Sequence, residues 1–460
     1  VGASAFRMYI AEYSNNEERQ LDFLIKPLRL GTDTFTQGYI SLENVKKAVE
    51  ILEMFRLKLE EYGITEYKAV CTSGVREAGN REFFLDYTYL HSGIRLEVLE
   101  PTEEIYIKYA GARQVVPGFK KLEKEGLVFA NVSSGNVTLN ISRKDLILYA
   151  GSLPYGSLRL RQMFSSISHL KRHKAIEEHV RVMISRVIST LDPSMALNHL
   201  LGAGSSINLM MRLFNPDEDN IITLPQLRDA YEKVRTLSLS EIQQETGLRK
   251  DEASVLVPTL ITYIHLLDIV GSKSFSFSAD SFPRTLALYY SGRLEDKQAA
   301  LRISRTLFNT AKKYRVNIRH VKWVNNFAKK IFDELCDLHS LGNAYRLVLE
   351  SAVILNDVGH YISDSNLAGN SFHIISALNI PGADPSMLHL AACVVYEANR
   401  SSAQQDPQEY MSLSRQELLN IRKLAGILRI AKALDYSRNR YIYSIDVVMG
   451  DQIIIYAQAE

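Results

Sequence analysis

The sequence predicts an α/β protein whose N-terminal part is duplicated and is followed by an all-helical part. Three observations carry this prediction. Two stretches, Val1 to Tyr13 and Leu127 to Ile141, each read as a strand, a turn of small residues and a second strand. Strands alternate with helices up to about residue 294, and from Glu295 the apolar spacing is almost wholly helical. The two hairpins suggest two related halves, each offering one turn to a shared cleft.

The composition is that of a globular chain with two to four domains. Of 460 residues, 46% are hydrophobic and 23% charged, and the formal net charge is +2. This balance gives no case for nucleic acid or a membrane as partner. Three distant cysteines, Cys71, Cys336 and Cys393, favour a reducing, cytoplasmic location. No apolar run approaches the ~20 residues of a membrane span, and no signal peptide opens the chain, although we expect residues beyond both ends.

In the first half, the alternation Phe6 to Ile10 predicts a strand after the turn Gly2 to Ala5. Leu28 to Gly31 reads as a short strand end with a glycine stop. A capped helix is expected from Ser41 to about Tyr62, and a buried strand over Lys68 to Cys71.

The next segment, Thr72 to Arg81, could aim hydroxyls and a guanidinium at an oxyanion. A buried strand delivers Thr72 and Ser73 into a turn, with Arg76 just inside the following helix. The alternative is that Arg76 pairs with a surface carboxylate and Ser73 merely caps the helix.

Two adjacent carboxylates open a further helix. After a strand over Leu96 to Leu99, Pro101 begins this helix, and Glu103 and Glu104 lie in its first turn. Acidic residues favour helix N-termini for dipole reasons alone, so the pair does not by itself indicate catalysis.

The turn of the second hairpin could cradle a phosphate. Ser133, Ser134 and Gly135 are small, so backbone N–H groups can converge on an anion while the hydroxyls add donors. An ordinary hairpin turn is the alternative.

Taken together, these motifs resemble the exopolyphosphatase and guanosine pentaphosphate phosphatase (Ppx/GppA) family. Thr72 to Arg81 and Ser152 to Leu160 are the most specific, and Leu200 to Ser206 resembles the family's later glycine-rich phosphate turn. The resemblance implies two actin-like, ribonuclease-H-like α/β domains around a cleft, followed by an all-α HD-like domain. The implied ranges are 1–124, 125–294 and 295–440, with 441–460 starting a β-containing segment.

The resemblance also implies a chemistry. Hydrolysis of a terminal phosphoanhydride needs donors for the phosphate chain, a divalent ion and a carboxylate that orients water. Glu103 is implied as the catalytic base, and Glu104 as a ligand that helps to hold Mg²⁺ or Mn²⁺. The implied phosphate-binding residues are Thr72, Ser73, Arg76, Ser133, Ser134, Gly135, Asn136, Gly204 and Ser205.

Several positions depart from the family pattern in the phosphate and metal shell. Asn131 replaces the carboxylate expected to hold Mg²⁺, and a neutral amide is a much weaker ligand for a hard cation. Thr138 replaces a second acidic residue, and Ser133 and Ser134 replace glycines. The turn Gly2 to Ala5 carries methyl groups where two polar side chains are expected. The sequence therefore keeps the motifs that indicate the family's fold, but it departs from the pattern at residues expected to bind phosphate and metal.

The helical part retains some features of an HD metal site. His320, Asp357 and Asp435 are candidate ligands, but Asn356 stands where the histidine of the His-Asp pair belongs. We therefore interpret this domain as packing and partner surface.

Two hypotheses follow. One is a phosphohydrolase, either efficient or weak, that acts on inorganic polyphosphate or guanosine pentaphosphate. The other is a catalytically impaired regulatory protein that binds polyphosphate or a guanine alarmone. The basic cluster Lys171 to Lys174, with Arg159 and Arg161, would suit a polyphosphate track, but a solvated helix start is the favoured interpretation. A homodimer is implied by the resemblance alone.

Overall fold

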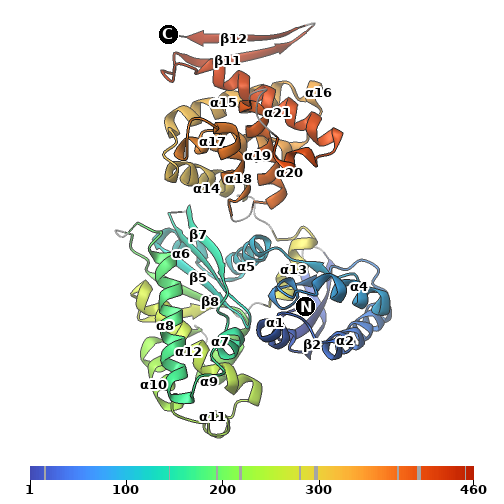
Figure 1. The fold of residues 1–460 in the computed structure, drawn as a ribbon, viewed down its shortest axis with the longest axis vertical. Helices are drawn as coiled ribbons and strands as arrows, with labels where there is room; N and C mark the ends of the chain where they lie inside the picture. Colours follow the sequence, from blue (N-terminus) through green and yellow to red (C-terminus); the bar gives the residue numbers. More distant parts are fainter. Residues whose placement is uncertain are drawn as a thin grey trace. The chain divides into compact units, whose positions relative to one another are not determined.

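In the computed structural model the chain forms two compact units, Val1–Asp296 and Lys297–Glu460, which we describe separately (Figure 1). The structure describes residues 1–14, 17–144, 146–192, 195–216, 220–278, 281–294, 299–380, 383–400, 406–450 and 452–459. The predicted start of the third domain at residue 295 and the end at residue 460 lie outside these residues. The predicted domain ranges stay predictions.

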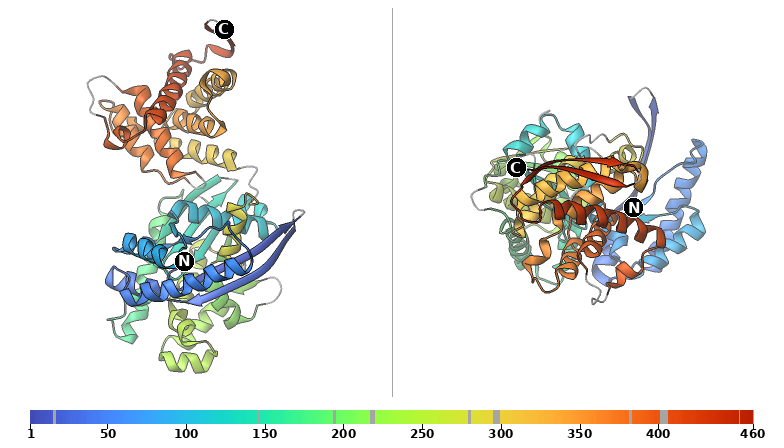
Figure 2. Two further views of the ribbon diagram at one scale, coloured as in Figure 1. Left: turned by 90° about the vertical axis from the view of Figure 1, so that its right-hand side faces the viewer. Right: turned by 90° about the horizontal axis from the view of Figure 1, so that it is seen from above.

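The first unit opens with a long antiparallel ribbon, coloured dark blue in Figure 2. The ribbon consists of β1 (Ala5–Ser14) and β2 (Glu17–Pro27). A short parallel pair of strands and six helices follow: α1 (Leu30–Gln37), α2 (Leu42–Glu61), β3 (Val70–Cys71), α3 (Ser73–Arg76), α4 (Arg81–Ser92), β4 (Glu97–Val98), α5 (Pro101–Val115) and α6 (Phe119–Glu125).

The prediction of a strand end at Leu28 to Gly31 is wrong, because Leu30 begins helix α1. A Cβ on Gly31 would lie 2.8 Å from both Ala3 and Phe35, so this glycine serves close packing and does not stop a strand. The helix predicted from Ser41 is confirmed, since the Ser41 hydroxyl accepts a hydrogen bond from the Asn44 N–H.

A six-stranded sheet forms the core of the remaining part of the first unit, in the order β7-β6-β5-β8-β10-β9. β5, β8 and β10 run parallel, and β6 pairs antiparallel with β5, which confirms the predicted second hairpin. The elements are β5 (Leu127–Val132), β6 (Val137–Arg143), β7 (Leu146–Leu153), α7 (Ser157–Met163), α8 (His169–Ile188), β8 (His199–Ala203), α9 (Ser205–Phe214), β9 (Ile221–Thr223), α10 (Leu224–Val234), α11 (Leu239–Thr246), α12 (Lys250–Val270), β10 (Ser274–Phe277) and α13 (Phe282–Tyr290).

Helix α12 is long and apolar enough to cross a membrane by length and composition alone. The structure buries 72% of its most apolar window, and the helix packs against α8, α10 and β8 (Figure 1). We therefore regard α12 as a core helix of the first unit.

The second unit is helical and ends in a β-hairpin, as the sequence predicts. The hairpin packs against α15 (Figure 1). The indole of Trp323, the chain's single tryptophan, donates a hydrogen bond to the carbonyl of Ile442. The elements are α14 (Ala299–Lys313), α15 (Ile318–Glu334), α16 (Cys336–His339), α17 (Asn343–Leu355), the 3₁₀ helix η1 (Val358–Tyr361), α18 (Leu367–Ser376), α19 (Pro385–Asn399), α20 (Gln408–Met411), α21 (Arg415–Leu434), β11 (Ile442–Met449) and β12 (Ile453–Ala459).

The packing of α5 against α13 predicts a contrast between two helical glycines. A Cβ on Gly111 would lie 2.3 Å from Thr285, whereas a Cβ on Gly426 would have nothing within 4 Å. Gly111→Ala is expected to lower the free energy of unfolding of its unit by about 1–3 kcal/mol through overpacking. Gly426→Ala is expected to raise that of its unit by up to about 1 kcal/mol through helix propensity. Denaturant titrations followed by circular dichroism measure both, and a stabilised Gly111→Ala would contradict the close contact.

Candidate active site

The carboxyl ends of two neighbouring parallel strands bring the second hairpin and the Leu200 to Ser206 turn together. The register of β5 with β8 places Asn131 opposite Ala203, and Gly204 follows at the start of α9. Gly204 has φ +96°, and a Cβ there would lie 2.7 Å from the carbonyl oxygen of Val132. Only glycine fits this close approach, so the sequence pattern at this turn has a structural reason.

A second pair of parallel strands presents the first half's candidate residues in the same way. Cys71 in β3 lies opposite Val98 in β4, and helices α3 and α5 follow these two strands. Arg76 on α3 and Glu104 on α5 are thereby brought together, with 3.1 Å between the guanidinium and the carboxylate. The two carboxyl ends therefore form one site within the first unit.

A cavity of about 890 Å³ opens where these turns meet. Eight of the nine predicted phosphate-binding residues line it: Thr72, Ser73, Ser133, Ser134, Gly135, Asn136, Gly204 and Ser205. The turns touch one another, because a Cβ on Gly135 would lie 2.3 Å from the Ser73 hydroxyl, and Ser134 donates a hydrogen bond to the Ser4 hydroxyl at 3.0 Å. The structure thus gathers the small-residue turns of both halves around one space.

The hairpin turn is anchored through its carbonyl groups. The carbonyl oxygens of Ser133 and Ser134 accept hydrogen bonds from the N–H groups of Ser157 and Leu158 at the start of α7. Within the part of the chain that the structure describes, the N–H groups of Ser134 and Gly135 donate to no protein acceptor. This turn therefore has free backbone N–H donors, the arrangement by which backbone nests bind anions.

Glu104 is buried, and two cations hold its carboxylate. Its Oε1 lies 2.6 Å from Lys108 Nζ and its Oε2 lies 3.1 Å from Arg76. Burial alone would raise the pKa of Glu104, but the charges of Lys108 and Arg76 outweigh it, so the pKa lies below its ordinary value. A carboxylate held ionised in this way is a poor proton acceptor at neutral pH.

Lys108 also reaches the second hairpin. Its ammonium donates a hydrogen bond to Asn131 Oδ1 at 3.2 Å, and the Ser133 hydroxyl donates to the same oxygen at 2.7 Å. The oxygens of Glu104 and Asn131 are therefore committed to donors of this chain. No group of three or more His, Cys, Asp or Glu side chains within the described residues could hold a metal ion. The residues present do not fit the divalent ion that the resemblance implies.

The structure places two residues outside the cavity although the resemblance implies roles for them within it. Glu103, the implied base, is not among the described residues that line the cavity; its carboxylate accepts a hydrogen bond from the Tyr290 hydroxyl at 3.1 Å. Arg76, expected to face a phosphate, is likewise outside the lining and bonds to Glu104 and to the Leu99 carbonyl. The direction of the Glu103 side chain depends on helix α5 and that of the Arg76 side chain on helix α3. Residue type alone does not reveal either direction.

Lys108, Arg7 and Asn208 line the cavity and were missed by the sequence reasoning. Lys108 follows Glu104 by four residues on a predicted helix, a spacing that signals an ion pair. Arg7 lies on β1, and no carboxylate among the described residues pairs with it; burial lowers the pKa of its guanidinium, which nonetheless stays charged. The alternation of β1 could have placed Arg7 on one face but not in this cavity.

The basic cluster takes no part in the cavity. Of the described residues that line it, none belongs to Lys171 to Lys174. Arg172 donates instead to the carbonyls of Ser165 and Ile167, and Arg159 bonds to the carbonyl of Gly135 and pairs with Glu77. These contacts support the helix-start interpretation.

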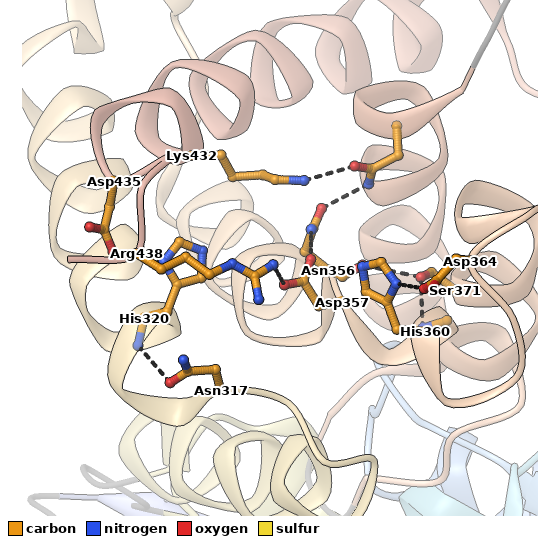
Figure 3. Close-up of polar contacts among 12 residues, drawn as sticks. Asn317, His320, Asn356, Asp357, His360, Asp364, Ser371, Lys432, Asp435 and Arg438 are labelled. Atoms are coloured by element: carbon orange, nitrogen blue, oxygen red, sulfur yellow. Dashed lines mark hydrogen bonds and ion pairs between the residues drawn. The ribbon is translucent and has the colours of Figure 1, made fainter. Parts of the chain in front are cut away.

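In the second unit, side-chain cations meet the residues expected to resemble a metal site (Figure 3). His320 lies 2.7 Å from Asp435, and Arg438 pairs with Asp357 at 3.3 Å. The Asn356 side-chain amide donates to Asp357, and its Oδ1 accepts a hydrogen bond from the Asn399 amide, whose own Oδ1 accepts from Lys432. The candidate ligands are thus divided between two separate interactions.

The His320–Asp435 pair predicts a stability effect in this unit. Asp435 is 2% exposed and also accepts a hydrogen bond from the Arg440 N–H, so Asp435→Ala leaves the buried His320 ring and the part-buried Arg440 N–H without this acceptor. We expect a loss of about 1–3 kcal/mol for each unsatisfied donor, measured by denaturant titration of Trp323 fluorescence. Asp364→Ala removes the exposed partner of His360 and is the control, with an expected change within about 0.5 kcal/mol. Equal losses in the two variants would contradict the prediction.

Comparisons with known proteins agree with this geometry. The chain matches the profile of the Ppx/GppA phosphatase family over residues 19–280 and that of Ppx/GppA phosphatase domain III over residues 302–451. A guanosine-5'-triphosphate,3'-diphosphate pyrophosphatase of Aliivibrio fischeri (strain MJ11) is 20% identical, over 97% of this chain and 90% of that protein.

Several solved structures are similar to the chain, and two of them illustrate the likeness. An exopolyphosphatase from Cytophaga hutchinsonii has a TM-score of 0.56 at 20% identity, covering 63% of this chain and 96% of that one. A Ppx/GppA family member from Aquifex aeolicus has a TM-score of 0.52 at 16% identity, covering 65% and 97%. These likenesses confirm the predicted actin-like α/β fold, and the match to domain III agrees with the helical domain that follows it. Since the first profile alone spans more than half of the chain, this protein belongs to the Ppx/GppA phosphatase family.

Proposed function

We propose that this protein binds a phosphoanhydride chain in the cavity of its first unit and hydrolyses it far more slowly than an efficient exopolyphosphatase. The ligand class is inorganic polyphosphate or the 5'-triphosphate of guanosine pentaphosphate. The observation that carries the proposal is the convergence of four turns, rich in hydroxyl and N–H donors, with Lys108 and Arg7 in one lining. Family membership and the named relatives support the same ligand class.

Slow hydrolysis follows from the state of the carboxylates. Glu104 is ion-paired on both oxygens and has a lowered pKa, so it is a weak base. Asn131 contributes an amide in place of a carboxylate. Binding a ligand therefore has more support from this site than activating a water molecule.

Hydrolysis with Glu103 as base is the second candidate function. It is favoured by one contact, since the Tyr290 hydroxyl that bonds to Glu103 belongs to a residue in the cavity lining. A ligand-induced shift of this side chain would be required to bring its carboxylate to an attacking water.

Phosphate release and calorimetric binding test both functions together. Inorganic polyphosphate and guanosine pentaphosphate are each incubated with the wild type and with Glu103→Ala, in Mg²⁺ or Mn²⁺. We expect the wild type to bind one of the two ligands and to release little phosphate from it. The Glu103→Ala substitution should leave this slow release unchanged. Rapid release that disappears in Glu103→Ala would establish the hydrolase instead, and the absence of binding to either ligand would overturn the proposal.

Arg7 gives a direct test of the ligand's charge. Removing an ion-paired contact of this kind costs about 1.5–3 kcal/mol, so Arg7→Met is expected to weaken polyphosphate binding by about tenfold to a hundredfold. Arg19→Met is the control, because Arg19 lies on the other strand of the same hairpin, outside the cavity lining, and pairs loosely with Glu12. Equal affinities for Arg7→Met and the wild type would show that the guanidinium does not meet the ligand.

A further inference from the structure

The Lys108 ammonium contacts two oxygen-bearing side chains of the cavity lining, those of Glu104 and Asn131. Lys108 Nζ is 2.6 Å from Glu104 Oε1 and 3.2 Å from Asn131 Oδ1, and it lies 4.9 Å from the centre of the Phe282 ring. The side chain is buried, so this position is fixed by packing as well as by charge.

A divalent ion placed against the same oxygens would have to displace these contacts. Mg²⁺ and Mn²⁺ need several oxygen ligands at about 2.0–2.2 Å, with carboxylates to offset their charge. Here the Glu104 carboxylate is shared by Lys108 and Arg76, and the Asn131 oxygen already accepts from Lys108 and Ser133. A metal ion would also be repelled by the neighbouring ammonium.

We propose that Lys108 is a resident cation of this cavity and supplies, beside the Glu104 and Asn131 oxygens, the positive charge toward a bound phosphate chain that a divalent ion would otherwise supply. The inference rests on the proposed function and adds that ligand binding is independent of divalent metal. An ammonium has three donors. Glu104 and Asn131 take two of them, and the third is left for a phosphate oxygen.

The local charge agrees with this role. Arg76 and Lys108 exceed Glu104 by one positive charge, and Lys108 shares the cavity lining with Ser133, Ser134 and Gly204. A phosphate bound at these turns would therefore lie next to a net positive charge of the protein, without a bound metal ion.

The first test uses Mn²⁺ alone, followed by electron paramagnetic resonance and calorimetry. The wild type is expected to bind no Mn²⁺ in the cavity. The variant Lys108→Met with Asn131→Asp, which removes the ammonium and restores a second carboxylate, is expected to gain a Mn²⁺ site. The inference would be overturned if the wild type bound Mn²⁺ and the double variant, Lys108→Met with Asn131→Asp, bound it no more tightly. This arm involves no phosphate ligand, so it is decided separately from the proposed function.

The second test measures tripolyphosphate binding in EDTA and in Mg²⁺. For the wild type the two affinities should agree within about twofold, whereas Lys108→Met should lose about tenfold in EDTA, equivalent to about 1.4 kcal/mol, and recover part of it in Mg²⁺. Lys121→Met, on the exposed surface of α6, is the matched control and should behave as the wild type. A tenfold loss by the wild type on removal of Mg²⁺ would overturn the inference, and this arm holds even where Lys108→Met fails to fold.

Discussion

Replacing Glu104 by alanine is expected to lower the free energy of unfolding of the first unit by about 3–5 kcal/mol, because it leaves two buried cations without their counter-charge. Arg76 and Lys108 both pair with this carboxylate, at 3.1 and 2.6 Å, and their side chains are 11% and 7% exposed. Because both side chains are largely buried, water would solvate the two unpaired charges poorly. Denaturant titration followed by circular dichroism measures the loss.

The adjacent carboxylate is the matched control. Glu103 lies in the same helical turn, but among the described residues its carboxylate accepts a hydrogen bond only from the Tyr290 hydroxyl, at an exposed position. Glu103→Ala is therefore expected to cost no more than about 1 kcal/mol. If the two variants lose similar stability, the buried cluster does not have the energetic role assigned to it.

The contribution of the Glu104 carboxylate to stability is expected to depend on pH. The folded-state pKa of Glu104 is below its ordinary value of 4.5, so its contribution to stability is complete above that value and is lost as the pH falls through the folded pKa. The stability difference between the wild type and Glu104→Gln should therefore be constant near neutral pH and narrow in strongly acidic solution. A difference that widens on acidification would have the wrong sign for this mechanism.

Local signals in the sequence were sufficient for most elements of the site. The Ser41 cap, the helix that opens at Pro101 and the hairpin from Leu127 each depend on neighbouring residues, and each was predicted correctly. The strand β2 was not, because charged residues interrupt its alternation and its pairing with β1 supplies the missing stability.

Contacts between distant segments could not be predicted in this way. Lys108 and Asn131 are 23 residues apart, and their hydrogen bond depends on how α5 packs against the end of β5. The sequence showed that Asn131 departs from a metal-binding pattern, but it did not show that an ammonium bonds to the amide. Glu103 and Glu104 were distinguishable only by the direction of each side chain from the helix.

Gly204→Ala is expected to have the largest effect on ligand binding. The residue has φ +96° and ψ −174°, a conformation essentially reserved for glycine, and an added Cβ would lie 2.7 Å from the Val132 carbonyl and 3.0 Å from Asn131 Oδ1. Strain and overpacking together cost about 2–5 kcal/mol of stability. The displaced Asn131 would also release Lys108, so tripolyphosphate affinity measured by calorimetry should fall by at least about a hundredfold, equivalent to about 2.7 kcal/mol.

Gly247→Ala separates backbone strain from the geometry of the cavity. Gly247 also has positive φ, +67°, but a Cβ there would have nothing within 4 Å, and the residue closes α11 outside the cavity lining. This variant should lose about 1 kcal/mol of stability and bind tripolyphosphate as the wild type does. If Gly204→Ala lost stability but kept its affinity for tripolyphosphate, the contact of Gly204 with Asn131 would have no part in binding. If the variant kept both its stability and its affinity, the turn would accommodate a Cβ, contrary to the close contacts of Gly204. The expected combination, a moderate loss of stability with a large loss of affinity, requires that the turn, Asn131 and Lys108 act as one phosphate-binding assembly.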